Sequence, residues 1–183
     1  MRRPTTIVLT VLTILLATSC QKDEAQKTYS TKYPVRCNFY VPTYTQLFNA
    51  MAGYGQYVTV RQTTDRQSGT SVIQMSDMLS TDNYAIDATM RYFNYGLGGL
   101  IIGMSTYTEP LAFDLACPNC DRAERRLSLK DDGTAVCSKC GITYDLNNYG
   151  FIRSVPDQCQ HLTPRGLYRY RITFYGDNVS VYN

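Results

Sequence analysis

The stretch CPNCDRAERRLSLKDDGTAVCSKCGITYD, residues 117–145, carries two Cys-x-x-Cys pairs separated by 16 residues. A tight turn at each pair, here called a knuckle, aims both sulfur atoms at one point. The Asp-Gly turn signal between the pairs predicts a hairpin that brings the two knuckles together. Four thiolates in a tetrahedral arrangement suit Zn²⁺ or iron. The spacing therefore predicts a metal site formed by Cys117, Cys120, Cys137 and Cys140.

Other uses of the cysteines stay open. Outside the cytoplasm the four can pair as two structural disulfides. A redox-active pair is a third use, although a thioredoxin-like site opens a helix after a strand and needs only one pair. Cys37 and Cys159 are left over, and they form either a disulfide with each other or buried free thiols.

The start of the chain indicates export. Two arginines precede an apolar run, residues 7–16, which is too short to span a bilayer but fits the core of a signal peptide. The segment Ala17-Thr18-Ser19-Cys20 resembles a bacterial lipobox. That resemblance implies that residues 1–19 are removed as a signal peptide and that Cys20 is lipidated. An ordinary signal peptide that happens to end near a cysteine is the alternative.

The residues after Cys20 read as a tether. Residues 20–34 are polar and charged without an apolar period, which predicts a lipidated, flexible linker ending at Pro34. Gln21-Lys22-Asp23-Glu24 resembles the acidic surface-export tag of Bacteroidetes lipoproteins. The resemblance implies attachment to the outer membrane through the acyl chains of Cys20, with display at the cell surface as a further expectation.

Composition limits the class of the remaining chain. Residues 1–19 hold two arginines and no acids, so the 18 basic and 15 acidic residues of the chain become 16 and 15 after cleavage. This balance gives no reason to expect binding to nucleic acid or strong attraction to anionic lipid. Sixteen tyrosines, no tryptophan and many β-branched residues favour strands. We expect a single, mainly β domain over residues 35–183.

Hydrophobic periodicity places the elements of this domain. A helix is predicted over 44–52 and a loop over 63–71, whereas 72–87 fits neither pattern. Strands are predicted over 35–41, 56–62, 96–107 and 110–117, and hairpins over 125–137 and 167–183.

Part of this chain resembles the Rieske iron–sulfur domain. The matching pieces are AFDLACPNC (112–120), VCSKCGITYDLNNYGFIRSVP (136–156) and LYRYRITFYGDNVSVY (167–182). The resemblance implies an antiparallel β-sandwich that contains a small, ribbon-like metal-binding subdomain over 115–158. It departs at the two histidine positions of a Rieske centre, which hold Asn119 and Cys140 here, while the one histidine of the chain, His161, lies outside the motif. A cluster with two histidine ligands is therefore excluded.

The ligand set favours zinc. Zn²⁺ can bind after export as the loops fold, whereas iron–sulfur clusters are inserted before export, and a [2Fe–2S] cluster at the same cysteines is the alternative. The sequence contains no paired-carboxylate, Ser/His/Asp or phosphate-loop site. We therefore expect a non-enzymatic lipoprotein that acts as a binding or assembly module with an unknown protein partner. Electron transfer is the alternative function.

Overall fold

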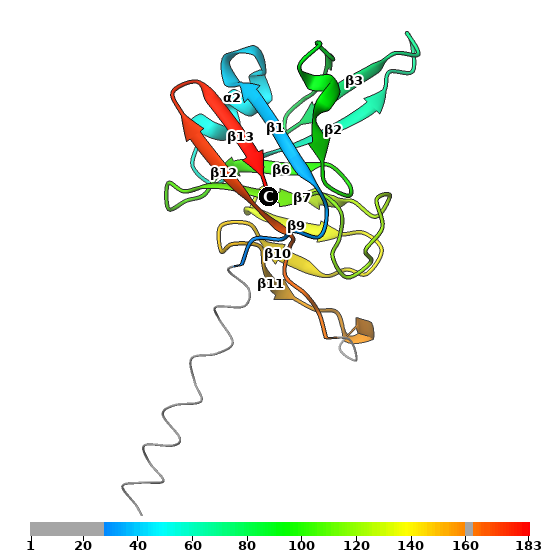
Figure 1. The fold of residues 1–183 in the computed structure, drawn as a ribbon. Coiled ribbons are helices and arrows are strands. Elements are labelled where there is room, and N and C mark those ends of the chain that lie inside the picture. Colours follow the sequence, from blue (N-terminus) through cyan, green and yellow to red (C-terminus); the bar gives the residue numbers. More distant parts are fainter. Residues whose placement is uncertain (1–27, 160–162) are drawn as a thin grey trace, which may run out of the picture.

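The computed structural model describes residues 28–159 and 163–183, and it is mainly β with antiparallel sheets (Figure 1). The predicted signal peptide, Cys20 and His161 lie outside the described residues. No helix within the described residues has the length and apolar character that crossing a membrane requires. The described residues form one large sheet of nine strands and one small sheet of four.

The described residues before β6 (Leu100–Met104) form one α-helix, two short 3-10 helices at Val41–Thr43 and Met90–Tyr92, and five strands. The helix and the two strands predicted up to residue 62 are confirmed. The ambiguous segment 72–87 contains most of β3 and all of β4, which pair with each other, and β3 also pairs with β2. Its second strand, β4, is polar and mostly exposed, which explains the missing alternation. The bounds are β1 Val35–Tyr40, α2 Thr45–Ala52, β2 Gln56–Thr64, β3 Ser71–Ser76, β4 Thr81–Ala85 and β5 Asn94–Tyr95.

The second half contains the small sheet between two neighbouring strands of the large one. Strands β7 and β12 pair with each other, and the whole small sheet, β8 to β11, lies between them in sequence. The bounds are β6 Leu100–Met104, β7 Pro110–Asp114, β8 Leu127–Leu129, β9 Thr134–Cys137, β10 Thr143–Asp145, β11 Phe151–Ser154, β12 Arg169–Tyr175 and β13 Asn178–Tyr182. Both predicted hairpins, β8–β9 and β12–β13, are confirmed.

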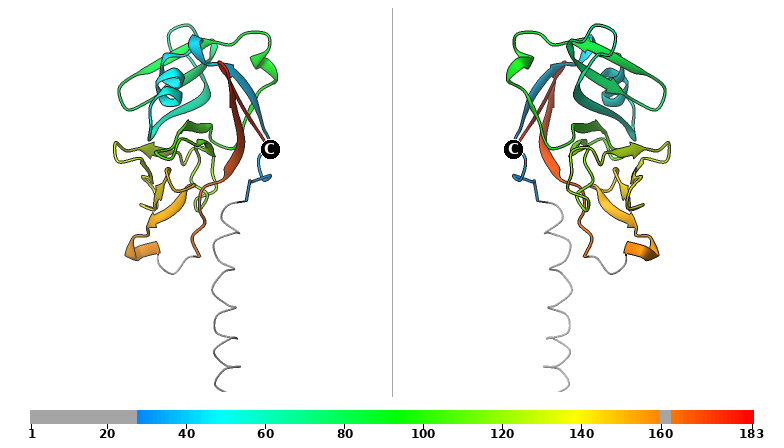
Figure 2. Two further views of the ribbon diagram at one scale, coloured as in Figure 1. Left: turned by 90° about the vertical axis from the view of Figure 1, so that its left-hand side faces the viewer. Right: turned by 90° about the vertical axis from the view of Figure 1, so that its right-hand side faces the viewer.

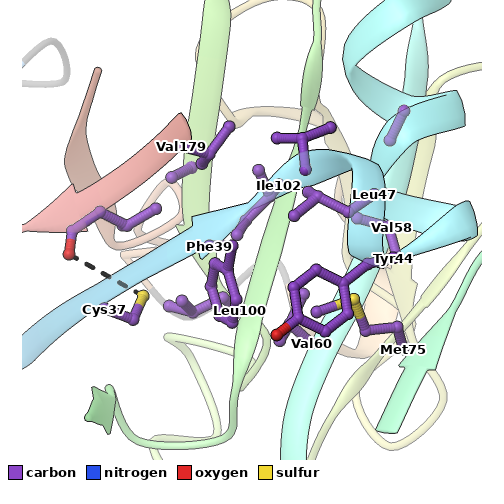
Figure 3. Packing of buried hydrophobic residues seen from close by; sticks show 14 of the residues in the cluster. Cys37, Phe39, Tyr44, Leu47, Val58, Val60, Met75, Leu100, Ile102 and Val179 are labelled. Carbon is purple, nitrogen blue, oxygen red and sulfur yellow. Dashed lines mark hydrogen bonds between the residues drawn. The ribbon is translucent and has the colours of Figure 1, made fainter. Parts of the chain in front are cut away.

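The large sheet folds over on itself around the first hydrophobic core. Its strand order is β4-β3-β2-β6-β7-β12-β13-β1-β5, and the layer formed by β1, β12 and β13 lies across from β2 and β3 (Figure 2). Figure 3 shows Phe39 of β1 packed among Val60, Leu100 and Ile102 of the facing strands, beside Leu47 of α2. The helix therefore fills the open side of this core.

Strands β6 and β7 are buried on both faces and separate the first core from a second one. In β6, Leu100 and Ile102 belong to the first core, whereas Ile101 belongs to the second. Its partner β7 alternates in the same way, with Ala112 in the first core and Phe113 in the second. Alternate side chains of each strand therefore point into different cores. The small sheet covers the second core.

The glycine-rich loop before β6 is held by a buried carboxylate. Asp114 is fully buried and accepts hydrogen bonds from the N–H groups of Leu97, Gly98 and Ala116 and from the hydroxyl of Tyr170. Gly98 has no room for a side chain because an added Cβ would lie 2.8 Å from Ala116. A glycine is therefore required at this position by the close approach of other backbone.

The last part of the predicted linker is not free. Ser30 donates its N–H to the carbonyl of Arg169, and Lys32 and Tyr33 bond to Asp121. Residues 30–33 therefore contact the body of the protein, whereas residues 20–27 of the expected linker lie outside the described residues. Hydrogen bonds across about 90 residues of sequence produce this docking, so local composition could not predict it.

Candidate metal centre

The four predicted cysteines meet in one cluster. All four sulfur atoms lie within 4.8 Å of one another. Sγ of Cys117 is 3.6 Å from Sγ of Cys140, and Sγ of Cys120 is 3.7 Å from Sγ of Cys137. Each of these contacts joins one knuckle to the other. The cluster is therefore close enough to hold a metal ion.

Both knuckles have the same backbone design. The carbonyl of Cys117 accepts a hydrogen bond from the N–H of Asp121, and the carbonyl of Cys137 accepts one from the N–H of Gly141, both at 2.8 Å. Each turn then ends in a residue with positive φ, 52° at Asp121 and 73° at Gly141. At Gly141 a side chain is also excluded by Pro156, which lies 2.8 Å from the position of a Cβ.

Strand pairing sets the distance between the knuckles. Leu127 of β8 lies opposite Cys137 of β9, and the N–H of Leu127 bonds to the carbonyl of Leu115. The N–H of Cys117 bonds in turn to the carbonyl of Arg125. The hairpin between the pairs therefore joins the strand before the first knuckle to the strand that carries the second.

Burial opposes ionisation of the metal-free cluster. Cys117 and Cys137 are buried, and Cys120 and Cys140 are half-buried. Burial raises the pKa of Cys120 to about 12 and also raises the pKa of Cys140. At Cys137 burial acts in the same direction, but hydrogen bonds from the N–H groups of Cys140 and Lys139 outweigh it and lower the pKa. A bound cation is what would let all four sulfurs ionise together.

A buried tyrosine contacts the sulfur cluster. The hydroxyl of Tyr144 lies 3.4 Å from Sγ of Cys117 and accepts a hydrogen bond from the side-chain amide of Asn119 at 2.8 Å. Because that oxygen accepts from Asn119, its own proton is available to the sulfur. Asn119 is held in turn by the backbone of Arg165, whose carbonyl accepts at 3.0 Å and whose N–H donates at 2.9 Å.

A second polar group joins the first knuckle to the start of the described chain. The carboxylate of Asp121 accepts hydrogen bonds from Lys32 at 2.5 Å and from the hydroxyls of Tyr33 and Tyr168, both at 2.8 Å. The Lys32 ammonium, helped by both hydroxyls, lowers the pKa of Asp121 to about 2. The carboxylate is therefore ionised at neutral pH and fixes the end of this turn.

The two remaining cysteines lie apart from each other. Cys37 is in the first core and donates to the carbonyl of Val181, whereas Cys159 is in the second core and its sulfur lies 3.4 Å from the carbonyl of Cys140. Both are free thiols. The Cys37–Cys159 disulfide is therefore not formed. The structure contains the alternative, two buried free thiols. Cys159 does lie beside the sulfur cluster.

The disulfide alternative for the four cysteines is also not formed. All six cysteines within the described residues are free. The shortest contacts between knuckles, 3.6 and 3.7 Å, are far longer than the roughly 2 Å of a disulfide bond.

Sequence reasoning missed the roles of Asp121 and Tyr144. Asp121 follows a knuckle directly, and a short polar residue that tolerates positive φ at that point was the available signal. Tyr144 lies in β10, but no local pattern of the sequence indicates its contact with Cys117. Comparisons with known protein families, with curated proteins and with solved structures give no match to this chain.

Proposed function

We propose that this chain is a membrane-anchored lipoprotein in which Cys117, Cys120, Cys137 and Cys140 hold a structural Zn²⁺ ion. The ion would stabilise a Rieske-like β domain that serves as a non-enzymatic binding or assembly module for a protein partner at the outer membrane. The single observation that carries the metal assignment is the convergence of four sulfur atoms within 4.8 Å.

The size of the cluster supports one ion over a two-iron centre. Metal–sulfur bonds of about 2.3 Å in a tetrahedron give edges of about 3.8 Å between sulfurs. The contacts of 3.6 and 3.7 Å between the knuckles are close to that value. A [2Fe–2S] cluster places its cysteine pairs on separate irons and so needs a wider arrangement. The proposal therefore ranks zinc above the cluster, and electron transfer is the less favoured function.

The surroundings of the cluster support a structural role. Four cysteine ligands complete a tetrahedron and leave no open position for a substrate. The four cysteines also form part of the second core or pack against it, beside Tyr144 and Leu127. A metal here would join two loops within a hydrophobic core, and its binding energy would become folding energy.

The membrane anchor is proposed from the sequence. Lipidation of Cys20 and the tag that follows it rest on the resemblance to a lipobox and to Bacteroidetes export signals. The Rieske-like assignment is supported by the order of the parts. The first knuckle follows β7, and the second leads into the Tyr144-Asp145 strand, which is followed by Gly150 at a φ of 76°.

Metal analysis of the full-length protein, with an absorption spectrum, tests the metal assignment. We expect one zinc per chain and no visible absorption, in protein exported by its native route and in protein made in the cytoplasm. Iron with inorganic sulfide and visible bands would replace this function with electron transfer. Protein without metal whose thiols fail to react until a reductant is added would replace it with a disulfide-stapled domain.

A metabolic label tests the anchor. Cells fed an alkyne-tagged fatty acid should incorporate it into the wild-type chain and into the matched control Cys37→Ser. They should not incorporate it into Cys20→Ser. Equal labelling of Cys20→Ser would contradict lipidation at this residue.

A further inference from the structure

A cationic cavity opens where the described chain begins. Its volume is about 370 Å³, within the usual range of small-ligand sites. Both arginines and aromatic residues line it, and none of the described lining residues is acidic. The lining residues are Thr28, Tyr29, Ser30, Pro164, Arg165, Gly166, Leu167, Tyr168 and Arg169.

The cationic groups at this cavity are held by aromatic rings. The guanidinium of Arg169 lies 4.9 Å from the ring centre of Tyr29 and 4.6 Å from that of Tyr149. The guanidinium of Arg171, which is not among the lining residues, lies 5.3 Å from the ring centre of Tyr29. Stacking uses the faces of a guanidinium, whereas its N–H donors lie in the plane and match the oxygens of a phosphate. These side chains are therefore partly ordered before any ligand arrives.

The wall of the cavity beside Arg165 is also fixed. Arg165 binds the side-chain amide of Asn119 through its backbone N–H and carbonyl. Its side chain takes no part in that pairing, and the residue is exposed. The guanidinium of Arg165 thus projects from an anchored backbone and is accessible to solutes.

No ion pair of the described residues engages Arg165. Asp121, which accepts a hydrogen bond from the cavity residue Tyr168, is engaged by Lys32 and by two tyrosine hydroxyls. The overall balance of 18 basic and 15 acidic residues therefore does not describe the local charge beside Arg165.

The position of the cavity in the chain indicates the source of the anion. Thr28, on its rim, is eight residues from Cys20, so even a fully extended chain keeps the cavity within about 29 Å of the lipidated residue. A membrane surface that carries anionic headgroups attracts clustered arginines held close to it.

We propose that this cavity binds the phosphate of an anionic lipid headgroup, with Arg165 and Arg169 as its ligands. The choice of a lipid as the source rests on the anchoring at Cys20 proposed above, whereas the phosphate chemistry rests on the cavity itself. The headgroup contact would hold the domain against the membrane that its acyl chains enter.

The first experiment measures the headgroup without requiring the anchor. Full-length protein in nonionic detergent is titrated with glycerophosphoglycerol, which is the deacylated headgroup of phosphatidylglycerol, and separately with glycerol. We expect saturable binding of the phosphodiester alone, weakened at least tenfold in Arg165→Ala and unchanged in the matched surface control Arg91→Ala. Absence of binding, or equal affinity of wild type and Arg165→Ala, would overturn the site.

The second experiment identifies the source. Full-length protein is placed in phosphatidylcholine nanodiscs with and without phosphatidylglycerol, and amide hydrogen exchange is followed over residues 164–169. Phosphatidylglycerol should slow exchange several-fold in wild type and in Arg91→Ala, but not in Arg165→Ala. The same slowing by inorganic phosphate in phosphatidylcholine nanodiscs would overturn the lipid assignment. Failure of the anchor would appear separately, as a lack of fatty-acid labelling, while the detergent titration would still report on the site.

Discussion

The hydroxyl of Tyr144 lies 3.4 Å from Sγ of Cys117, and both residues belong to the second core. A hydroxyl that donates to a metal-bound thiolate stabilises its negative charge and orients it. The contact therefore joins the strand after the second knuckle to the first cysteine of the first knuckle.

Tyr144→Phe should weaken zinc binding about tenfold, because the hydrogen bond to Cys117 is lost while the ring still fills the core. Competition with a chromogenic chelator measures the affinity. The matched control is Tyr57→Phe, which removes a hydroxyl from the same core that bonds to Asn147 at 3.1 Å. Equal affinities in the two variants would contradict the role of Tyr144.

Cys137→Ser should lower the free energy of unfolding by roughly 3 kcal/mol or more, because a buried ligand and its metal are lost together. Chemical denaturation with and without a chelator measures this. The chelator should bring wild type down towards the variant and leave the variant unchanged. Cys37→Ser, which alters a buried thiol outside the cluster, should remain sensitive to the chelator. An unchanged denaturation curve for Cys137→Ser would rule out a structural metal.

Metal affinity should rise with pH. Burial raises the pKa of Cys120 to about 12, so this thiol carries its proton in the metal-free protein at pH 7 and must release it to bind a metal. Each proton released strengthens the measured affinity about tenfold per pH unit below that pKa. Calorimetry in buffers of different ionisation enthalpy counts the protons. We expect at least one per metal ion, and a count of zero would show that the thiols are already ionised.

Asp121→Asn should loosen residues 28–33 without disturbing the knuckle. Asparagine tolerates the positive φ of this position, but it loses the charge that holds Lys32. The N–H of Ser30, bonded to Arg169, should then exchange a few-fold faster in hydrogen-exchange measurements. Glu124→Gln, which breaks an exposed ion pair with Arg122 in the same loop, should leave Ser30 unchanged. Equal protection in wild type and Asp121→Asn would mean that the tyrosine contacts alone dock the segment.

Local sequence signals predicted the parts of the site that are close in the chain. The spacing of the two pairs predicted the sulfur cluster, because a hairpin of this length closes on itself. The alternation of apolar and polar residues predicted β12 and β13. These strands are also close in the chain, because a single turn joins them. Strand β4 was not predicted because neither of its faces is apolar. Its place at the edge of the sheet is set by pairing with β3.

Contacts between distant segments could not be predicted. Lys32 and Asp121 are 89 residues apart, and each alone is an ordinary exposed charge in the sequence. The pairing of β1 with β13 likewise joins the two ends of the domain. Such contacts depend on which surfaces the finished sheet brings together, and hydrophobic period does not contain that information.

The burial of β6 and β7 on both faces determines which fragments of this protein can fold alone. Ile101 and Phe113 form the floor on which the small sheet rests, and Leu100 and Ile102 on the reverse side support the helix and β1. A fragment of residues 115–158 would keep every sulfur ligand and lose that floor. Residues 115–158 are thus not expected to fold as an independent domain. Their packing depends on β6 and β7 of the large sheet. A shift of one residue in the register of β6 would exchange the side chains that face the two cores and disrupt both.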